Sequence, residues 1–286
     1  SLAGMEPTDA VTLNNFWPLT TSVQFRKGYT QYSTGLLAQV ETLMTYAGAS
    51  TVKLFGIAGN KIYDCTAGGA VGAAAVSGLT NSRFQYVNIS TAGGNFIMAV
   101  NGADKLRYFD GTTWSIDGGV NIITGVDTAT CGNINLFKTR IWLCQNGTLK
   151  VWYLPVNSIA GLAASLDFSS IARRGGTLVA MGTWTIDAGT GADDLAVFVT
   201  SQGEVIVYKG TDPTSSTTWS LVGVWQIGAP IGKRCLYKWM GDLLMMTQDG
   251  LGPLSLLLQS SRVGGQCRRR HGARRRAIPR RSPGQA

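Results

Sequence analysis

Short apolar runs separated by polar turns recur five times along this chain. The segment LAVFVTSQGEVIVYKG (195–210) contains an apolar run, a polar turn around Gly203, and a second run in which apolar and polar residues alternate. Two such runs predict a β-hairpin. The pattern predicts further hairpins at 52–65, 95–111, 136–155 and 242–255, with turn glycines at Gly59, Gly102, Gly147 and Gly250.

The spacing of these glycines indicates one repeated unit. Successive glycines lie 43, 45, 56 and 47 residues apart, and propeller blades of four strands repeat at about 40–50 residues. We interpret the longer third interval as an insertion at 172–194. A single blade cannot bury both faces of its sheet, whereas blades stacked around an axis can. The sequence therefore predicts an all-β fold, an incomplete β-propeller of about five blade-like repeats. The alternatives are a two-sheet sandwich or several small β domains.

Tryptophans recur at a similar place after two of these hairpins. FDGTTWS (109–115) and TDPTSSTTWSLVG (211–223) each place a turn and then a tryptophan after a hairpin. We expect each of these tryptophans to begin a further strand. A wide, flat side chain fills the wedge between blades, and glycine allows the positive φ of a tight turn. The expected architectural residues are therefore the five turn glycines and the blade-packing residues Trp114, Trp142, Trp152 and Trp219.

The pattern divides the chain into three parts. We expect an N-terminal strand or arm segment at 1–36, the propeller repeats at 37–263, and an Arg-rich disordered tail at 264–286. Helix is scarce, and only 36–46 and 158–165 resemble short helical turns. No apolar stretch reaches the roughly 18 residues of a membrane-spanning helix, and no signal peptide opens the sequence. We therefore expect no membrane partner.

The formal net charge of +9 comes from the C-terminal end alone. Residues 1–261 contain 16 basic and 16 acidic residues, and nine arginines follow between Arg262 and Arg281. A neutral body does not indicate a basic face for nucleic acid. The tail could contact nucleic-acid phosphates, or it could be an out-of-frame extension without a role. We favour the second interpretation because charge is balanced elsewhere.

Histidine and cysteine usage excludes most catalytic and metal sites. His271 is the only histidine and lies in the tail, which removes histidine-based catalysis and metal ligation from the body. Cysteines lack the regular spacing of a zinc site or a disulfide scaffold, and they are expected to be free thiols. They are Cys65, Cys131, Cys144, Cys235 and Cys267.

Several carboxylates fall in Gly-rich or Pro-rich segments. Asp193, Asp194, Asp212 and Asp242 are examples, and aspartate is a normal turn former in such segments. We therefore interpret them as turn residues and not as an acid–base pair. The sequence predicts no enzyme activity, no cofactor and no metal.

The N-terminal stretch contains DAVTLNN (9–15), Trp17-Pro18 and RKGY (26–29). Through these residues it resembles virion structural proteins of short-tailed phages and prophages. Segments 91–114, 149–161, 193–213 and 241–255 are similar to the same group, so the resemblance covers roughly residues 1–263. It stops after Val263. Because members of that group continue further, the sequence is expected to be truncated at its C-terminus.

The resemblance implies a non-enzymatic tail nozzle or tail-hub subunit that forms part of the DNA-ejection channel. It implies a homo-oligomer, a hexameric ring, that contacts portal-adaptor and other tail proteins and lets DNA pass transiently. Such a protein is assembled in the cytoplasm of the bacterial host and is located in the virion tail. The alternative function is a propeller binding module that recognises a carbohydrate or protein receptor at its mouth.

Overall fold

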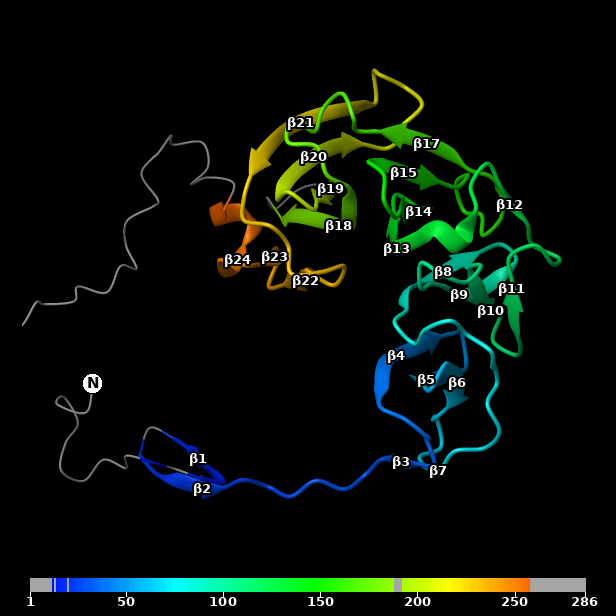
Figure 1. The fold of residues 1–286 in the computed structure, drawn as a ribbon, viewed down its shortest axis with the longest axis vertical. Helices are drawn as coiled ribbons and strands as arrows, with labels where there is room; N and C mark the ends of the chain where they lie inside the picture. Colours follow the sequence, from blue (N-terminus) through cyan, green and yellow to red (C-terminus); the bar gives the residue numbers. More distant parts are fainter. Residues whose placement is uncertain (1–11, 13, 20, 188–191, 258–286) are drawn as a thin grey trace, which may run out of the picture.

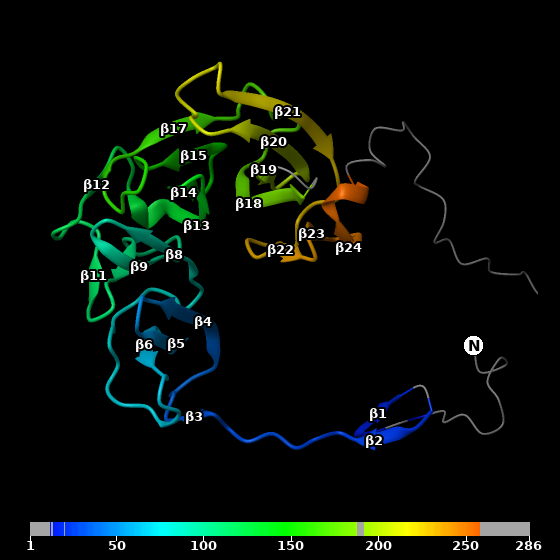
Figure 2. The same cartoon turned by 180° about the vertical axis from the view of Figure 1, so that it is seen from behind.

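Five β-sheets of three or four strands follow one another around a common centre and form an open arc (Figure 1), which Figure 2 shows from behind. This computed structural model describes residues 12, 14–19, 21–187 and 192–257. Helical structure within these residues consists of a 3₁₀ turn at Thr128–Thr130 and one helical turn at 254–257. The predicted all-β propeller arrangement of five repeats is confirmed.

We number the sheets blades 1 to 5 in chain order. In each blade, neighbouring strands are antiparallel and follow the order of the chain. The strands are β4 (Val40–Ala47), β5 (Val52–Ala58) and β6 (Lys61–Asp64) in blade 1; β8 (Gln85–Thr91), β9 (Gly94–Val100), β10 (Arg107–Phe109) and β11 (Trp114–Ile116) in blade 2; β13 (Cys131–Phe137), β14 (Arg140–Gln145), β15 (Lys150–Tyr153) and β17 (Ala164–Asp167) in blade 3; β18 (Leu178–Asp187), β19 (Ala192–Thr200), β20 (Glu204–Gly210) and β21 (Trp219–Gln226) in blade 4; and β22 (Leu236–Trp239), β23 (Asp242–Thr247) and β24 (Gly250–Pro253) in blade 5.

The middle strands of the interior blades are apolar on both faces. In β9, Phe96, Met98 and Val100 pack toward blade 3, whereas Ile97 and Ala99 pack toward blade 1. Strands β14 and β19 alternate in the same way between their two neighbours. Because successive side chains of a strand point to opposite faces, a strand between two blades is an unbroken apolar run. Four apolar clusters fill the four junctions between consecutive blades.

The turn glycines occupy equivalent places in the five blades. Each lies at the connection between the second and third strands of its blade, where it has positive φ. The φ angles are +56° at Gly59, +75° at Gly102, +71° at Gly147, +78° at Gly203 and +134° at Gly250. The repeat read from these glycines therefore follows the blades themselves.

Three of the four tryptophans make ring contacts with aromatic residues of a neighbouring blade. Trp114 begins β11 and packs on Phe55 of blade 1, with ring centroids 5.1 Å apart. Trp219 begins β21 and stacks on Trp142 of blade 3 at 5.5 Å. The fourth, Trp152 on β15, is partly buried against the cluster between blades 2 and 3.

Two helical turns expected from the sequence are wrong. Residues 40–47 form β4, in which Thr42, Met44 and Tyr46 are buried in alternation. Residues 158–165 include β16 (Gly161–Leu162) and the start of β17. Strand β16 pairs in parallel with β12 (Ile123–Thr124) and ties blade 3 to the chain that leaves blade 2. Packing against the neighbouring blade decides the conformation in β4, not the helix-like spacing of its apolar residues.

The interpretation of 172–194 as an insertion is also wrong, because this segment contains β18, the innermost strand of blade 4. Its Gly182 reflects a close approach of blade 5. A Cβ atom there would lie 2.8 Å from Cδ1 of Leu236 and 3.0 Å from Cδ2 of Leu243. Glycine in a strand often marks such an approach.

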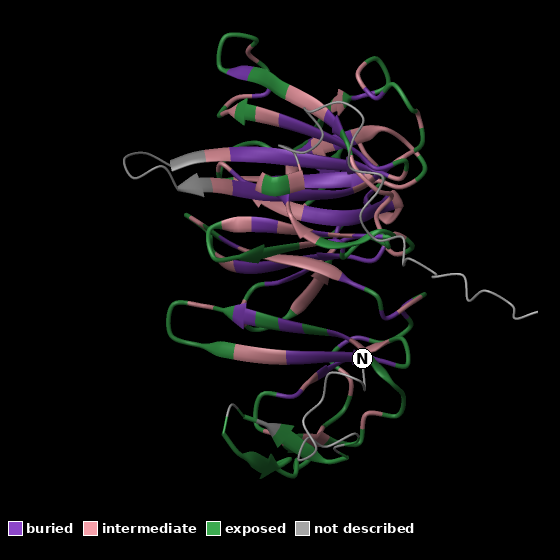
Figure 3. Ribbon diagram, turned by 90° about the vertical axis from the view of Figure 1, so that its left-hand side faces the viewer, coloured by how far each residue is buried: buried purple, intermediate pink, exposed green. Residues whose placement is uncertain are grey.

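The described N-terminal residues form an arm that stands clear of the blades (Figure 1). Strands β1 (Phe16–Pro18) and β2 (Val23–Phe25) pair as an antiparallel hairpin. The chain then runs to β3 (Ser33–Thr34), which pairs in parallel with β7 (Gly69–Ala70) beside blade 1. Figure 3 shows buried residues along the stacked blades and an exposed hairpin at one end. The expected tail at 264–286, with His271 and Cys267, lies outside the described residues.

Candidate binding site at the centre of the arc

The innermost strands of the blades line a central cavity. A cavity of about 830 Å³ is bordered by residues of all five blades, and a second cavity of about 990 Å³ shares part of its lining. We call the region that the two cavities share the mouth. Its shared lining residues are Val40, Glu41, Gln85, Lys233 and Arg234.

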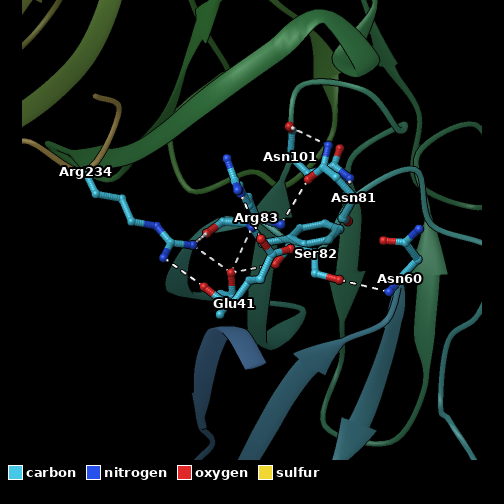
Figure 4. A network of polar contacts seen from close by, with 9 residues as sticks. Glu41, Asn60, Asn81, Ser82, Arg83, Asn101 and Arg234 are labelled. Atoms are coloured by element: carbon cyan, nitrogen blue, oxygen red, sulfur yellow. Dashed lines mark hydrogen bonds and ion pairs between the residues drawn. The ribbon is translucent and has the colours of Figure 1, made fainter. Parts of the chain in front are cut away.

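Arg234 connects the chain entering blade 5 to blades 1 and 2. Its guanidinium donates to the carbonyl of Glu41 at 3.0 Å, to Oγ1 of Thr42 at 2.6 Å and to the carbonyl of Phe84 at 2.8 Å. Figure 4 shows the side chain reaching across from the far side toward Glu41. The fork of donors in guanidinium suits such multiple contacts, so Arg234 spans the open side of the arc.

Thr42 is the acceptor at the centre of this contact. Its hydroxyl accepts from Arg234 and from the Phe84 N–H at 3.0 Å, and it donates to the carbonyl of Ser82 at 2.7 Å. One donor and two acceptor positions are the full capacity of a hydroxyl. Thr42 therefore holds blade 1, blade 2 and the Arg234 segment together through one buried atom.

A charged pair stands beside this contact. Nε of Arg83 lies 2.9 Å from Oε1 of Glu41, and the Arg83 side chain is 79% exposed. The backbone N–H of Arg83 donates to Oδ1 of Asn81 at 2.9 Å. The side-chain amide of Asn81 donates to the backbone carbonyl of Asn101, and the side-chain amide of Asn101 donates to the backbone carbonyl of Asn81. The rim that carries Arg83 is therefore held in place, whereas the guanidinium faces solvent.

Lys233 is the second cation of the mouth, and its side chain is exposed. A Cβ at Gly132 would overlap its Nζ, and one at Gly102 would lie 3.2 Å from it, so the ammonium rests against glycine backbone. Burial lowers the pKa of Lys233, although the nearby Cys144 thiol opposes the change. No ion pair joins Lys233 to a carboxylate among the described residues. The exposed ammonium is therefore accessible to an anionic partner.

The carboxylates that the sequence singled out lie apart from the mouth and hold local structure. Asp194 accepts from Oγ1 of Thr185 at 2.7 Å and pairs with Lys138 at 2.9 Å. Asp212 accepts hydrogen bonds from Thr214 in its own turn and pairs with Arg140 at 3.4 Å. Asp242 accepts from the N–H of Leu243 and from the hydroxyl of Ser255. The structure describes no side chain for Asp193. No group of three or more metal-ligating residues occurs in the described part of the chain.

The described cysteines are free and buried. Burial raises the pKa of Cys131 to about 12 and that of Cys235 to about 11. Burial also raises the pKa of Cys144. Thiols with such values carry almost no thiolate at neutral pH and behave as small apolar residues.

Sequence reasoning did not identify the mouth. Arg234 and Thr42 are 192 residues apart, and the distance between Arg234 and Phe84 along the chain is 150 residues. The adjacent pair Lys233-Arg234 in a neutral body was the available signal. No helix among the described residues is long and apolar enough to cross a membrane.

No family model and no curated protein matches the chain. Solved structures do match. The crystal structure of BBS1N in complex with ARL6DN, soaked with mercury, superposes with a TM-score of 0.50 at 15% identity, over 81% of this chain and 70% of that chain. The same complex soaked with lead gives a TM-score of 0.47 at 15% identity, over 76% of this chain and 66% of that chain. The first similarity concerns the fold alone, and it supports the β-propeller arrangement.

Proposed function

We propose that this chain is a non-enzymatic assembly subunit, a tail nozzle or tail-hub protein of a short-tailed phage or prophage. The observation that carries the proposal is the open arc. Blades 1 and 5 do not close on one another as neighbouring blades do, and the Arg234 contacts bridge them at the mouth. Sheet faces that a closed propeller would bury are therefore available to other chains.

The phage setting rests on the resemblance of residues 1–263 to virion structural proteins. A neutral body suits a subunit that docks by shape and apolar contact, because the core of a protein interface is depleted in charge. In this proposal the chain forms a homo-oligomeric ring, contacts portal-adaptor proteins, and belongs to the virion tail. It needs no cofactor.

Coexpression with the products of neighbouring genes tests this function. We expect the chain to copurify with a portal or adaptor ring and to form rings in negative-stain electron microscopy. A chain that remains monomeric at all concentrations, and whose neighbouring genes encode no virion proteins, would contradict the proposal.

A second candidate function is a binding module that takes an anionic group at the mouth. Lys233, exposed and without a carboxylate partner among the described residues, favours it, with exposed Arg83 on the rim. The ligand class is a carbohydrate or protein receptor that bears carboxylates. We expect a glycan array containing sialylated sugars, or an array of acidic peptides, to show binding that Lys233→Met abolishes. Lys209→Met, which removes an exposed cation on β20, is the matched control. Binding that both variants keep would exclude the mouth as the site.

A further inference from the structure

In the part of the chain that the structure describes, blade 5 has an apolar sheet face on which no other blade packs. The pairings of β22, β23 and β24 place Tyr237, Trp239, Leu244, Met246 and Leu251 on the side opposite to blade 4, where all of them except Trp239 also line the central cavity. Trp239 is 51% exposed and Leu251 is 64% exposed. We call these five residues the free face.

The free face has the sequence of an interior blade. In β23, Leu243 and Met245 pack into the cluster shared with blade 4, while the intervening Leu244 and Met246 point to the free face. This two-sided apolar alternation is the one that β9, β14 and β19 use between two neighbouring blades. A strand that needs to cover one face only normally alternates with polar residues. The sequence of β23 therefore suits a second packing partner.

Blade 1, at the other end of the arc, covers part of its outer face with its own chain. A Cβ at Gly56 would lie 3.2 Å from Cδ2 of Leu36 and 3.0 Å from Sγ of Cys65. The chain that leads into β4 thus lies over the middle of blade 1. Blade 5 has no comparable cover on its free face within the described residues.

The N-terminal arm has the complementary property. Phe16 and Phe25 are cross-strand partners in the β1–β2 hairpin, with ring centroids 4.8 Å apart, and Phe25 is 79% exposed. Further along the arm, Tyr29 is 93% exposed. An isolated two-stranded hairpin is marginally stable in water, so an apolar hairpin standing clear of its own blades needs a surface to dock on.

Charge also matches the two surfaces. Residues 14–35 contain the cations Arg26 and Lys27 and no carboxylate. On the free face, Asp242 is the cross-strand partner of Trp239. The one lysine of β22, Lys238, alternates to the opposite side of the sheet and acts on Asp194 of blade 4. Opposite charges around an apolar contact steer the association and fix its orientation.

We propose that the β1–β2 hairpin of one copy docks on the free face of blade 5 of a second copy. This inference rests on the proposed assembly function and names the contact that builds the assembly. The two surfaces are different parts of the chain, so each copy donates an arm and receives one. Such a head-to-tail contact closes into a ring when the rotation between copies permits it.

Two single variants and one control test the contact in the full chain. Phe25→Ser removes the exposed ring of the arm, and Trp239→Ser removes the exposed ring of the free face. Leu162→Ser changes a residue of β16 that is exposed to a similar extent. Because loss of a central aromatic residue weakens an interface strongly, we expect each of the first two to raise the dissociation constant about tenfold or more. The control should leave it unchanged, as measured by light scattering across a concentration series.

Mixing the two defective variants distinguishes exchange from other arrangements. The Phe25→Ser copy retains an intact free face, and the Trp239→Ser copy retains an intact arm. We expect their equimolar mixture to form a dimer of one copy of each, although neither variant associates alone at that concentration. The mixed dimer should not grow further, since its remaining arm and face are both defective.

The other outcomes would contradict either arm exchange or self-assembly. If the parent associates but the mixture does not form the dimer, arm exchange is wrong while the assembly function stands. If the parent is monomeric and Phe25→Ser lowers its melting temperature, the arm docks on its own chain. If the parent is monomeric and neither variant changes its stability, both this contact and self-assembly are wrong.

Discussion

Gly203 joins the β19–β20 hairpin of blade 4 to the chain that leads into blade 5, and Gly203→Ala tests that junction. Its N–H donates to the carbonyl of Thr200 at 3.0 Å, and its carbonyl accepts from the N–H of Ile227 at 2.8 Å. The φ angle is +78°. An added Cβ would overlap the carbonyl oxygen of Ile227 and lie 2.8 Å from the carbonyl carbon and oxygen of Gly228. The obstacles are backbone atoms, which cannot rotate away.

The expected loss of stability has two parts. A left-handed backbone costs an L-residue roughly 1–2 kcal/mol, and forcing atoms into a filled space costs about 1–3 kcal/mol more. We therefore expect a loss of about 3 kcal/mol. At about 2–4 °C per kcal/mol for a chain approaching this size, the melting temperature should fall by roughly 6–12 °C.

Gly147→Ala is the matched control for this variant. Gly147 occupies the equivalent turn of blade 3 with φ +71°, and a Cβ there would meet no heavy atom within 4 Å. It should therefore lose only the backbone part, about 1–2 kcal/mol. Calorimetry of both variants isolates the overlap. Equal melting temperatures for the two, or a Gly203→Ala variant that melts with the parent, would refute the assigned junction between blades 4 and 5.

Four further predictions concern the mouth, the core and ionisation. Thr42→Val keeps the shape of the side chain but removes the hydroxyl that accepts from Arg234 and from the Phe84 N–H. Because each unsatisfied buried group costs about 1–3 kcal/mol, urea unfolding should show a free energy of unfolding lowered by about 3 kcal/mol. Trp142→Ala empties the junction between blades 3 and 4 and should cost about 3–5 kcal/mol in the same assay, and a smaller loss than that of an exposed tryptophan would contradict its burial. Burial raises the pKa of Asp194, but hydrogen bonds from Thr185 and Lys138 outweigh this and bring the pKa below its ordinary 3.8. A carboxylate whose pKa is lower in the folded state stabilises the fold at pH values above its unfolded-state pKa. The stability advantage of the parent over Asp194→Asn should therefore be complete near neutral pH and shrink as the pH falls below about 4. Cys131 and Cys235, whose pKa values burial raises to about 12 and about 11, should resist iodoacetamide at pH 8 in the native protein and react after unfolding, as mass spectrometry would detect.

The sequence predicts the blade repeat because each blade carries its own turn chemistry. A glycine with positive φ between the second and third strands is a local requirement, and so is the tryptophan that begins β11 or β21. These signals do not depend on how the blades are arranged. The periodicity of the chain therefore predicts the number of blades.

What the sequence could not predict depends on contacts between blades. Strand β4 resembles a helix because apolar residues on both its faces, such as Leu43 and Met44, give it a helix-like spacing. Strand β18 resembles a loop because Gly182 makes room for Leu236 and Leu243 of blade 5. In both cases the deciding neighbour comes from another blade.

The mouth was missed for the same reason. Arg234, Thr42 and Phe84 meet only because the arc brings blade 5 back toward blades 1 and 2. Their separation along the chain corresponds to no local motif that would predict the contact. The free face of blade 5 is different: its two-sided apolar strand DLLMMT was visible in the sequence, and only the arc shows that one of its sides lacks a neighbour.

Cryo-electron microscopy of the full chain, purified at a concentration where it associates, tests most directly whether this protein is an open propeller built for assembly. The account predicts five blades around one axis in each copy, with the Phe16–Phe25 hairpin of the next copy lying against Tyr237 and Trp239. Copies that close on themselves, or whose sheets lie face to face as a sandwich, would contradict it.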